Sequence, residues 1–230
     1  MVKRLNRRDK MVVLVIENGE FDEFMHRQGR DMDLKDTKTS KFVNTIQLRS
    51  SFYDLLNQEL SDFDLEEISL TFGGGWTSAR KIFRQNKKDN PDDSTLLLID
   101  SDVPDNEKET ERIKRKLEPK EDIFFMVQET EAWFLSQPKI LEEQYGKKDN
   151  TIADLIVEKP QDYAKPSTIL DNILKQHYPE KPTNKNGNLY QKAKDDAALI
   201  KRLNLSKLKE DFDDVHRLIN TLQTKIATNA

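Results

Sequence analysis

Short apolar runs, each about as long as a buried strand, recur along the first part of the chain. Four of them predict strands: Met11–Ile16, Ile68–Phe72, Leu96–Ile99 and Ile123–Val127. After the first run, apolar residues recur near helical spacing from 39 to 60, which predicts a long amphipathic helix. Strands that alternate with helices are typical of a doubly wound sheet. We therefore expect an α/β fold with a mostly parallel, Rossmann-like sheet flanked by helices.

The segments between these runs carry weaker signals. They predict a glycine turn at 73–75, a helix capped by Thr77 or Ser78 and running to about Lys87, a charged and exposed stretch at 104–120, and a helix at about 129–145. Trp133 lies among apolar residues and is expected in the core, whereas Trp76 lies beside the glycine turn and is the better candidate for stacking on a base.

After Gly146 the pattern changes, because apolar residues become sparser and only helical periodicities remain. The most regular one spans 206–226, where an apolar stripe predicts packing onto the core or onto a partner. We predict two parts: an α/β domain over residues 1–146, and a helical C-terminal extension over residues 147–230 that packs on this core.

Composition narrows the function classes. The 230 residues carry 38 basic and 42 acidic side chains, so any nucleic-acid contact has to come from local patches. The lack of cysteine excludes thiolate metal sites and cysteine nucleophiles. No segment reaches membrane-spanning length, and Met11–Ile16 is too short for a signal peptide. We expect a soluble, cytoplasmic protein without membrane contacts.

Acidic residues follow two of the predicted strands. The run Leu96–Ile99 leads into Asp100, Ser101 and Asp102, and residues two apart on a strand project from the same side. Asp100 and Asp102 are therefore expected to face one hard cation. If the first and third strands are neighbours, Glu17 lies beside this pair, and so many carboxylates would repel one another without a cation.

Two further groups are candidates for the same site. Glu131 begins the helix after the fourth strand, where it either adds to the acidic cluster or only complements the helix dipole. Arg80 and Arg84 share one helical face behind the glycine turn, a pattern that suits phosphate binding as well as an ordinary solvated face.

The ends of these strands resemble the TOPRIM fold of topoisomerases, primases and overcoming-lysogenization-defect nucleases, in which a first strand ends in glutamate and a later strand in Asp-x-Asp. The segment 126–135 with Glu131, the glycine turn before Arg80, and Tyr190 followed by Lys192 resemble a bacterial family of TOPRIM-like proteins of undefined function. The resemblance spans most of the chain.

This resemblance implies a nuclease that depends on Mg²⁺ or Mn²⁺ and cleaves DNA or RNA. It implies that Glu17 is a metal ligand or general base and that Asp100 and Asp102 are metal ligands, with Glu131 completing a second metal site. Lys192 joins Arg80 and Arg84 as a nucleic-acid contact. Members of the family are often encoded beside AAA-type or SMC-like ATPases in phage-defence loci, so an ATPase partner is expected, and a homo-oligomer stays open.

One departure from the TOPRIM pattern leaves alternatives. The position four residues after Glu17, where many TOPRIM nucleases have a second acid, is Phe21, with Glu20 and Asp22 nearby. Either a one-residue shift brings Asp22 or Glu20 into the site, or the metal shell is reduced.

Two other functions are also open. One is a non-catalytic subunit that binds nucleic acid or an ATPase through the apolar face of 206–226. The other is a metal-dependent glycosyltransferase, which would leave Glu17 and the segment 128–133 without a role.

Overall fold

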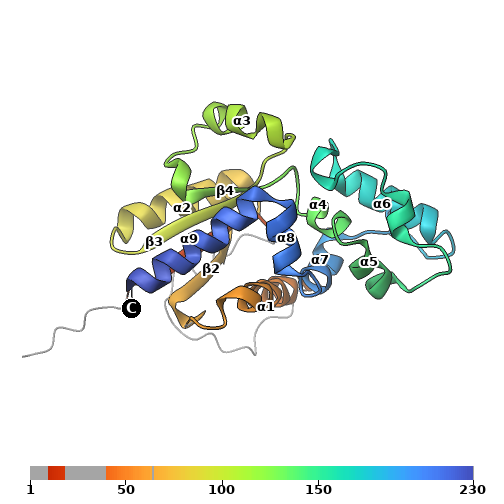
Figure 1. The fold of residues 1–230 in the computed structure, drawn as a ribbon, viewed down its shortest axis with the longest axis horizontal. Helices are drawn as coiled ribbons and strands as arrows, with labels where there is room; N and C mark the ends of the chain where they lie inside the picture. Colours follow the sequence, from red (N-terminus) through yellow and green to blue (C-terminus); the bar gives the residue numbers. More distant parts are fainter. Residues whose placement is uncertain (1–9, 19–39, 64, 230) are drawn as a thin grey trace, which may run out of the picture.

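The structure, a computed structural model, describes residues 10–18, 40–63 and 65–229, except for the side chains of 40–44 and 229. A four-stranded parallel sheet with the strand order β2-β1-β3-β4 forms its centre (Figure 1). The strands are β1 (Val12–Ile16), β2 (Ile68–Phe72), β3 (Ser94–Asp100) and β4 (Ile123–Met126). The predicted α/β class, with a parallel sheet flanked by helices, is confirmed.

The strand order reverses between β1 and β3. The chain moves from β1 outward to β2 and then returns past β1 to β3, which pairs with β1 so that Ile16 lies opposite Leu98. Open α/β sheets bind ligands outside the carboxyl ends of the two strands at such a reversal. Glu17 and Asp100 stand at these two ends.

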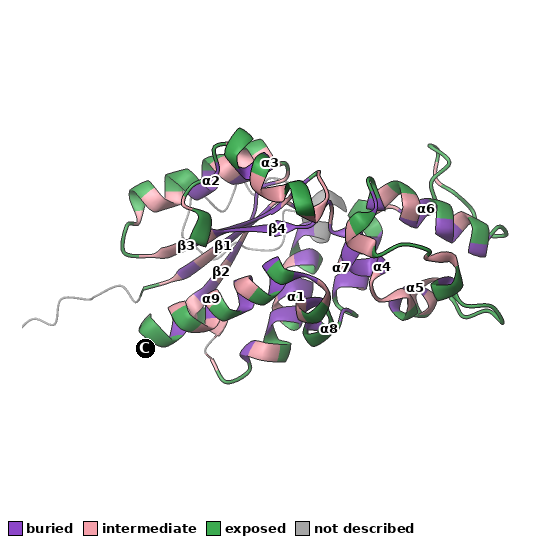
Figure 2. Cartoon of the chain, turned by 45° about the horizontal axis from the view of Figure 1, so that its top comes forward, coloured by how far each residue is buried: buried purple, intermediate pink, exposed green. Residues whose placement is uncertain are grey.

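Helices cover both faces of the sheet (Figure 2). One face carries α1 (Ser40–Leu60), α8 (Leu205–Asp211) and α9 (Asp213–Asn229), and alternate strand residues such as Leu14 and Leu98 point into this layer. The opposite face carries α2 (Trp76–Asp89), which packs on Val15 and Leu97. Strands that are buried on both faces have no polar alternation, which fits β1, β3 and β4. The edge strand β2 alternates buried Ile68, Leu70 and Phe72 with half-buried Ser69 and Thr71.

The turn between β2 and α2 depends on glycine. A Cβ on Gly73 would lie 2.4 Å from the Cα of Ala79, so no larger residue fits there, and Gly74 has a φ of 71°. The predicted cap at Thr77 or Ser78 is wrong, because α2 begins at Trp76 with Gly75 as its N-cap.

The stretch at 104–120 is exposed only in part, whereas the sequence predicts exposure throughout. It contains a 3₁₀ turn (Asp105–Glu107) and α3 (Lys108–Lys114), in which Glu111 and Arg112 are buried. Burial is possible because Arg112 donates to the Ile123 carbonyl at 3.2 Å and stacks on Phe125.

Two predicted helices are each divided in two. The helix at 129–145 is α4 (Glu131–Leu135) and α5 (Pro138–Tyr145), because proline is tolerated in a first helical turn but not in the middle of a helix. The helix at 206–226 is α8 and α9, which are separated at Phe212. Its apolar stripe packs on the core: Leu218, Ile219 and Leu222 are buried in the layer against the sheet.

The remaining helices are α6 (Pro166–His177) and α7 (Lys192–Ile200), with short 3₁₀ turns at Leu65–Glu67, Lys120–Asp122, Ile152–Leu155 and Pro160–Asp162. In Figure 1, α4, α5 and α6 lie beyond one end of the sheet, whereas α7 packs on α1. The proposed domain boundary at 146 stays a prediction. Across the described ranges, no helix is long and apolar enough to span a membrane.

Candidate functional site at the carboxyl ends of β1 and β3

Glu17 lies directly after β1 and reaches across to β3. Its Oε2 accepts a hydrogen bond from the Asp100 backbone N–H at 3.2 Å, and a second backbone hydrogen bond comes from Trp76 at the start of α2. Burial and the nearby Asp102 carboxylate raise the pKa of Glu17 to about 7, although the Arg115 guanidinium acts in the opposite direction. Glu17 is therefore a carboxyl that holds or releases a proton near neutral pH.

Asp100 is the last residue of β3. Because residues two apart on a strand point to the same face, the side chain of Asp100 points, like that of Leu98, toward the layer that contains α7. The side chain is 13% exposed, and its Oδ2 lies 3.9 Å from the Nζ of Lys192. Its Oδ1 is buried and has no hydrogen-bond partner in the described part of the chain. Burial raises the pKa of Asp100 well above its ordinary value, and the Glu17 and Glu131 carboxylates add to this against the effect of Lys192.

Lys192, the first residue of α7, bridges two strand ends. Its Nζ lies 3.4 Å from Oε1 of Glu131, whose side chain is 1% exposed at the start of α4. Burial alone would lower the pKa of Lys192, but the carboxylates of Glu131 and Asp100 raise it above its ordinary range. Lys192 is therefore a permanently charged ammonium between the carboxyl groups that follow β3 and β4.

A second layer of polar groups supports Glu131. The Tyr190 hydroxyl lies 2.9 Å from Glu131 Oε1 and also hydrogen-bonds Asp196, which accepts from Asn18 Nδ2 at 3.2 Å. Burial and the charge of Glu131 raise the pKa of Asp196 to about 7. Because a phenol has one proton to donate, two carboxyl groups at one phenol favour a proton on one of them.

Asp102 does not face the same way as Asp100, contrary to the expectation from strand alternation. The strand ends at Asp100, and Asp102 has a left-handed φ of 57°, so the alternation stops before it. Its side chain is 59% exposed and pairs with Arg115 at 2.8 Å. Arg115 also donates to the carbonyls of Asp100 and Ser101, both at 3.0 Å, and thereby holds this turn.

The donor set can be tested for its fit to a divalent cation. Within the described ranges, no three His, Cys, Asp or Glu side chains are placed to hold a metal ion together, and the Lys192 ammonium lies between Asp100 and Glu131. The chemistry nevertheless fits a hard cation, because Glu17 and Asp100 are half-buried oxygen donors with raised pKa values, and the buried Oδ1 of Asp100 has no hydrogen-bond partner among the described residues. Asp22, the other predicted ligand, lies outside the described residues.

Residues 23–223 match a protein family described as a domain of unknown function, DUF4276. The chain belongs to this family. No curated protein and no solved structure matches it. The DUF4276 match includes Asp100, Glu131 and Lys192, whereas Glu17 precedes it.

Two of the predicted phosphate contacts of this DUF4276 chain, Arg80 and Arg84, lie on α2, whose first residue Trp76 donates a backbone hydrogen bond to Glu17. The Trp76 ring has Arg80 at 5.6 Å and Arg115 at 5.3 Å from its centroid. Arg84 is exposed one turn further along, and Arg80 Nε is buried without a hydrogen-bond partner among the described residues. Trp133 is 2% exposed in the core, as predicted.

A pocket of about 440 Å³ adjoins the site between α6 and the segment 188–192. Glu131 and Lys192 form the side that faces the strand ends, and Thr168, Asn172 and Asn188 form the side away from them. We call it the α6 pocket.

Three site residues of the DUF4276 chain were not among the sequence candidates: Asn18, Arg115 and Asp196. Asp196 had a signal, because it lies on a short helix with Leu199 and Ile200 and is as buried as they are. The only sequence signal for Arg115 was its spacing of four residues from Glu111, which suits an ion pair on a helix; the two side chains pair at 2.6 Å. Asn18 had no sequence signal beyond its position two residues after β1.

Proposed function

We propose that this protein is a metal-dependent nuclease with a TOPRIM-like site. One observation carries the proposal: Glu17 and Asp100 converge where the strand order reverses, and the buried Oδ1 of Asp100 has no partner there. An excess of carboxyl groups with raised pKa values favours a bound divalent cation, and such a cation together with the ammonium of Lys192 would stabilise a negatively charged phosphate ester.

Glu17 and Asp100 would hold Mg²⁺ or Mn²⁺. The bound cation would supply positive charge for the phosphate oxygens and would lower the pKa of a water molecule. Lys192 supplies a second positive charge at a fixed place, because Glu131 and Asp100 hold its ammonium from two sides. Tyr190 and Asp196 position Glu131 and so keep Lys192 in place.

The resemblance to TOPRIM proteins supports the same activity and extends it to partners. DNA and RNA are both candidate substrates, and the proposal includes an AAA-type or SMC-like ATPase as the protein that controls cleavage in phage defence. Arg80 and Arg84 are the candidate phosphate contacts on the α2 side of the site.

The test is cleavage of plasmid DNA and of transfer RNA in Mg²⁺, in Mn²⁺ and in a chelator. We expect the parent to cut one substrate with a metal present, and Glu17→Gln and Asp100→Asn each to lower the rate at least about 100-fold. Glu143→Gln is the matched control, because Glu143 is an exposed acid on α5. Equal rates for the parent and both site variants would contradict the proposal.

A non-catalytic binding subunit is the second candidate. It is favoured by the lack, in the described part of the chain, of three converging metal ligands. It predicts that the parent cuts nothing and that Glu17→Gln binds nucleic acid or an ATPase as tightly as the parent. The apolar face of 206–226 cannot be its contact surface in this conformation, because α8 and α9 bury that face against the sheet and α1.

The glycosyltransferase alternative has its own test in the same experiment. A rise in melting temperature with a nucleotide sugar and Mn²⁺, without cleavage of nucleic acid, would replace the nuclease proposal, because a ligand that binds only the folded state stabilises it.

A further inference from the structure

Glu131 and Lys192 belong both to the candidate site and to the lining of the α6 pocket. The pocket therefore lies where a substrate bound at the site would extend. Lys192 contacts Asp100 and Glu131 on one side and lines the pocket on the other. A phosphate beside Lys192 would leave the adjoining part of the substrate at the mouth of this pocket.

Hydrogen bonds within the chain build the floor of the pocket. The Oδ1 of Asp171 accepts the backbone N–H groups of Leu189 and Tyr190 at 2.7 and 2.9 Å. Glu129 accepts the N–H of Ser167 at 2.8 Å and so already places a negative charge at the start of α6. The lysines that line the pocket are also paired within the chain, Lys175 with Asp171 and Lys192 with Glu131, so a neutral polar group is the expected occupant.

Residues on the exposed side of the pocket can form hydrogen bonds with a neutral polar ligand. Thr168, Asn172 and Asn188 are exposed, and the side chains of Asn172 and Asn188 make no hydrogen bond within the described part of the chain. Amide side chains donate and accept at once, as the edges of nucleobases and the hydroxyls of sugars require.

The volume of the pocket limits what enters it. At about 440 Å³ it lies within the roughly 300–1,000 Å³ of small-ligand sites. A base that remains paired and stacked in a duplex cannot enter such a pocket, and enzymes that bind a base in this way take it out of the helix or use single strands.

We propose that the α6 pocket is a subsite for one unpaired nucleotide adjoining the scissile phosphate. This proposal rests on the proposed function and sharpens it: the substrate is single-stranded nucleic acid, or a duplex with an unpaired or frayed stretch. The pocket could take a nucleotide of DNA or of RNA, so the experiment compares single strands of both.

The test measures binding in the presence of a chelator, so that cleavage does not interfere. Labelled 12-nucleotide single strands of DNA and RNA are compared with the corresponding duplexes by fluorescence anisotropy at one salt concentration. The double variant Asn172→Ala with Asn188→Ala should weaken single-strand binding about tenfold, since it removes two sets of neutral hydrogen bonds. Asn220→Ala is the control, because Asn220 is an exposed asparagine on the remote helix α9.

A second variant, Asn172→Trp, places a large side chain in the pocket and should weaken single-strand binding at least as much. Melting curves of all variants establish that they fold. Unchanged single-strand affinity in both pocket variants, or duplex binding by the parent that is as tight as single-strand binding, would overturn the proposal.

Failure of the nuclease proposal gives a different result. If the parent cleaves nucleic acid and the pocket variants bind and cleave like the parent, only the pocket assignment fails. If the parent cleaves nothing but binds 5′-mononucleotides in calorimetry, and the double variant loses that binding, the subsite stands and the nuclease proposal fails.

Discussion

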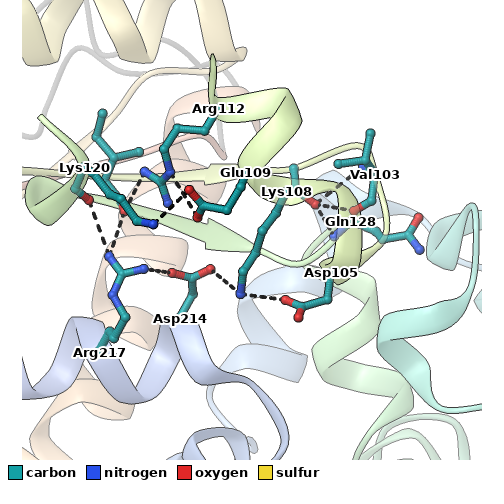
Figure 3. A network of polar contacts seen from close by, with 11 residues as sticks. Val103, Asp105, Lys108, Glu109, Arg112, Lys120, Gln128, Asp214 and Arg217 are labelled. Carbon is teal, nitrogen blue, oxygen red and sulfur yellow. Dashed lines mark hydrogen bonds and ion pairs between the residues drawn. The ribbon is translucent and has the colours of Figure 1, made fainter. Parts of the chain in front are cut away.

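Two clusters of buried charge lie beside β4, and they differ in how their charges are matched. In the first, Asp214 on α9 is fully buried and contacts both Lys108 and Arg217, which tie α9 to the segment between β3 and β4 (Figure 3). In the second, the ammonium of Lys192 is shared by Glu131 and Asp100, and Asp196 also acts on it.

This difference separates a structural cluster from a functional one. A buried carboxylate with two cationic neighbours is neutralised within the fold and needs nothing more. Carboxyl groups that outnumber their cations bind protons more tightly, as the raised pKa values of Asp100 and Asp196 indicate, or they bind a cation from solution. Removing a charge should therefore have opposite consequences in the two clusters.

The largest effect is expected from Asp214→Ala. This change leaves Lys108 and Arg217 without their shared buried partner and should lower the free energy of unfolding by about 3 kcal/mol. Urea denaturation measures it. Asp213→Ala, which alters the exposed neighbouring residue, should cost less than about 1 kcal/mol. Equal losses for the two variants would show that the Asp214 cluster is not the structural tie described here.

A smaller effect of opposite sign is expected from Asp196→Asn. Asp196 has a pKa of about 7 in the folded protein and roughly 3.9 in the unfolded chain, so the unfolded chain loses its proton first as the pH rises. This group therefore lowers stability progressively between about pH 4 and pH 7.

Asparagine does not titrate, so Asp196→Asn does not lose stability in this way as the pH rises. At pH 8 Asp196→Asn should be more stable than the parent by at least about 1 kcal/mol, and at pH 4 the two should be nearly equal. Urea denaturation at both pH values measures the difference, with the exposed Asp154→Asn as control. A variant less stable than the parent at pH 8 would show that Asp196 is needed as a charged partner.

The smallest effect is expected outside both clusters, at Arg84. It is exposed and makes one 3.3 Å hydrogen bond, to the Lys116 carbonyl, so Arg84→Ala should change stability by less than about 0.5 kcal/mol. If Arg84 contacts a phosphate, oligonucleotide affinity should fall about threefold and the slope of log affinity against log salt should decrease by about 1. Lys81→Ala, at another exposed position on α2, is the control. An equal loss in that variant would indicate a general charge effect.

The strands and the two central acids could be predicted from the sequence because their signals are local. The runs that form β1, β3 and β4 are short and uninterrupted, and Glu17 and Asp100 follow two of them directly. Only the neighbouring position of β1 and β3, which the sequence left conditional, was needed to bring them together.

The other residues of the site depend on tertiary contacts that leave no periodic signal. Arg115 lies in a charged segment whose composition indicated solvent exposure, and its partners are backbone carbonyls at the end of β3. Asp102 was misplaced because strand alternation was extended two residues beyond the end of β3, to a residue whose backbone is left-handed. Asp196 reaches the site only because α7 packs on α1.

The position of α9 also constrains how this chain folds during synthesis. The sheet face that includes Leu14 is closed by residues near 219, which are synthesised about 200 positions after β1. At roughly 5–20 residues per second, the part of this face that α9 covers stays open for about 10–40 seconds after β1 is made. The chain therefore exposes apolar surface during synthesis for longer than a fold built from local contacts would.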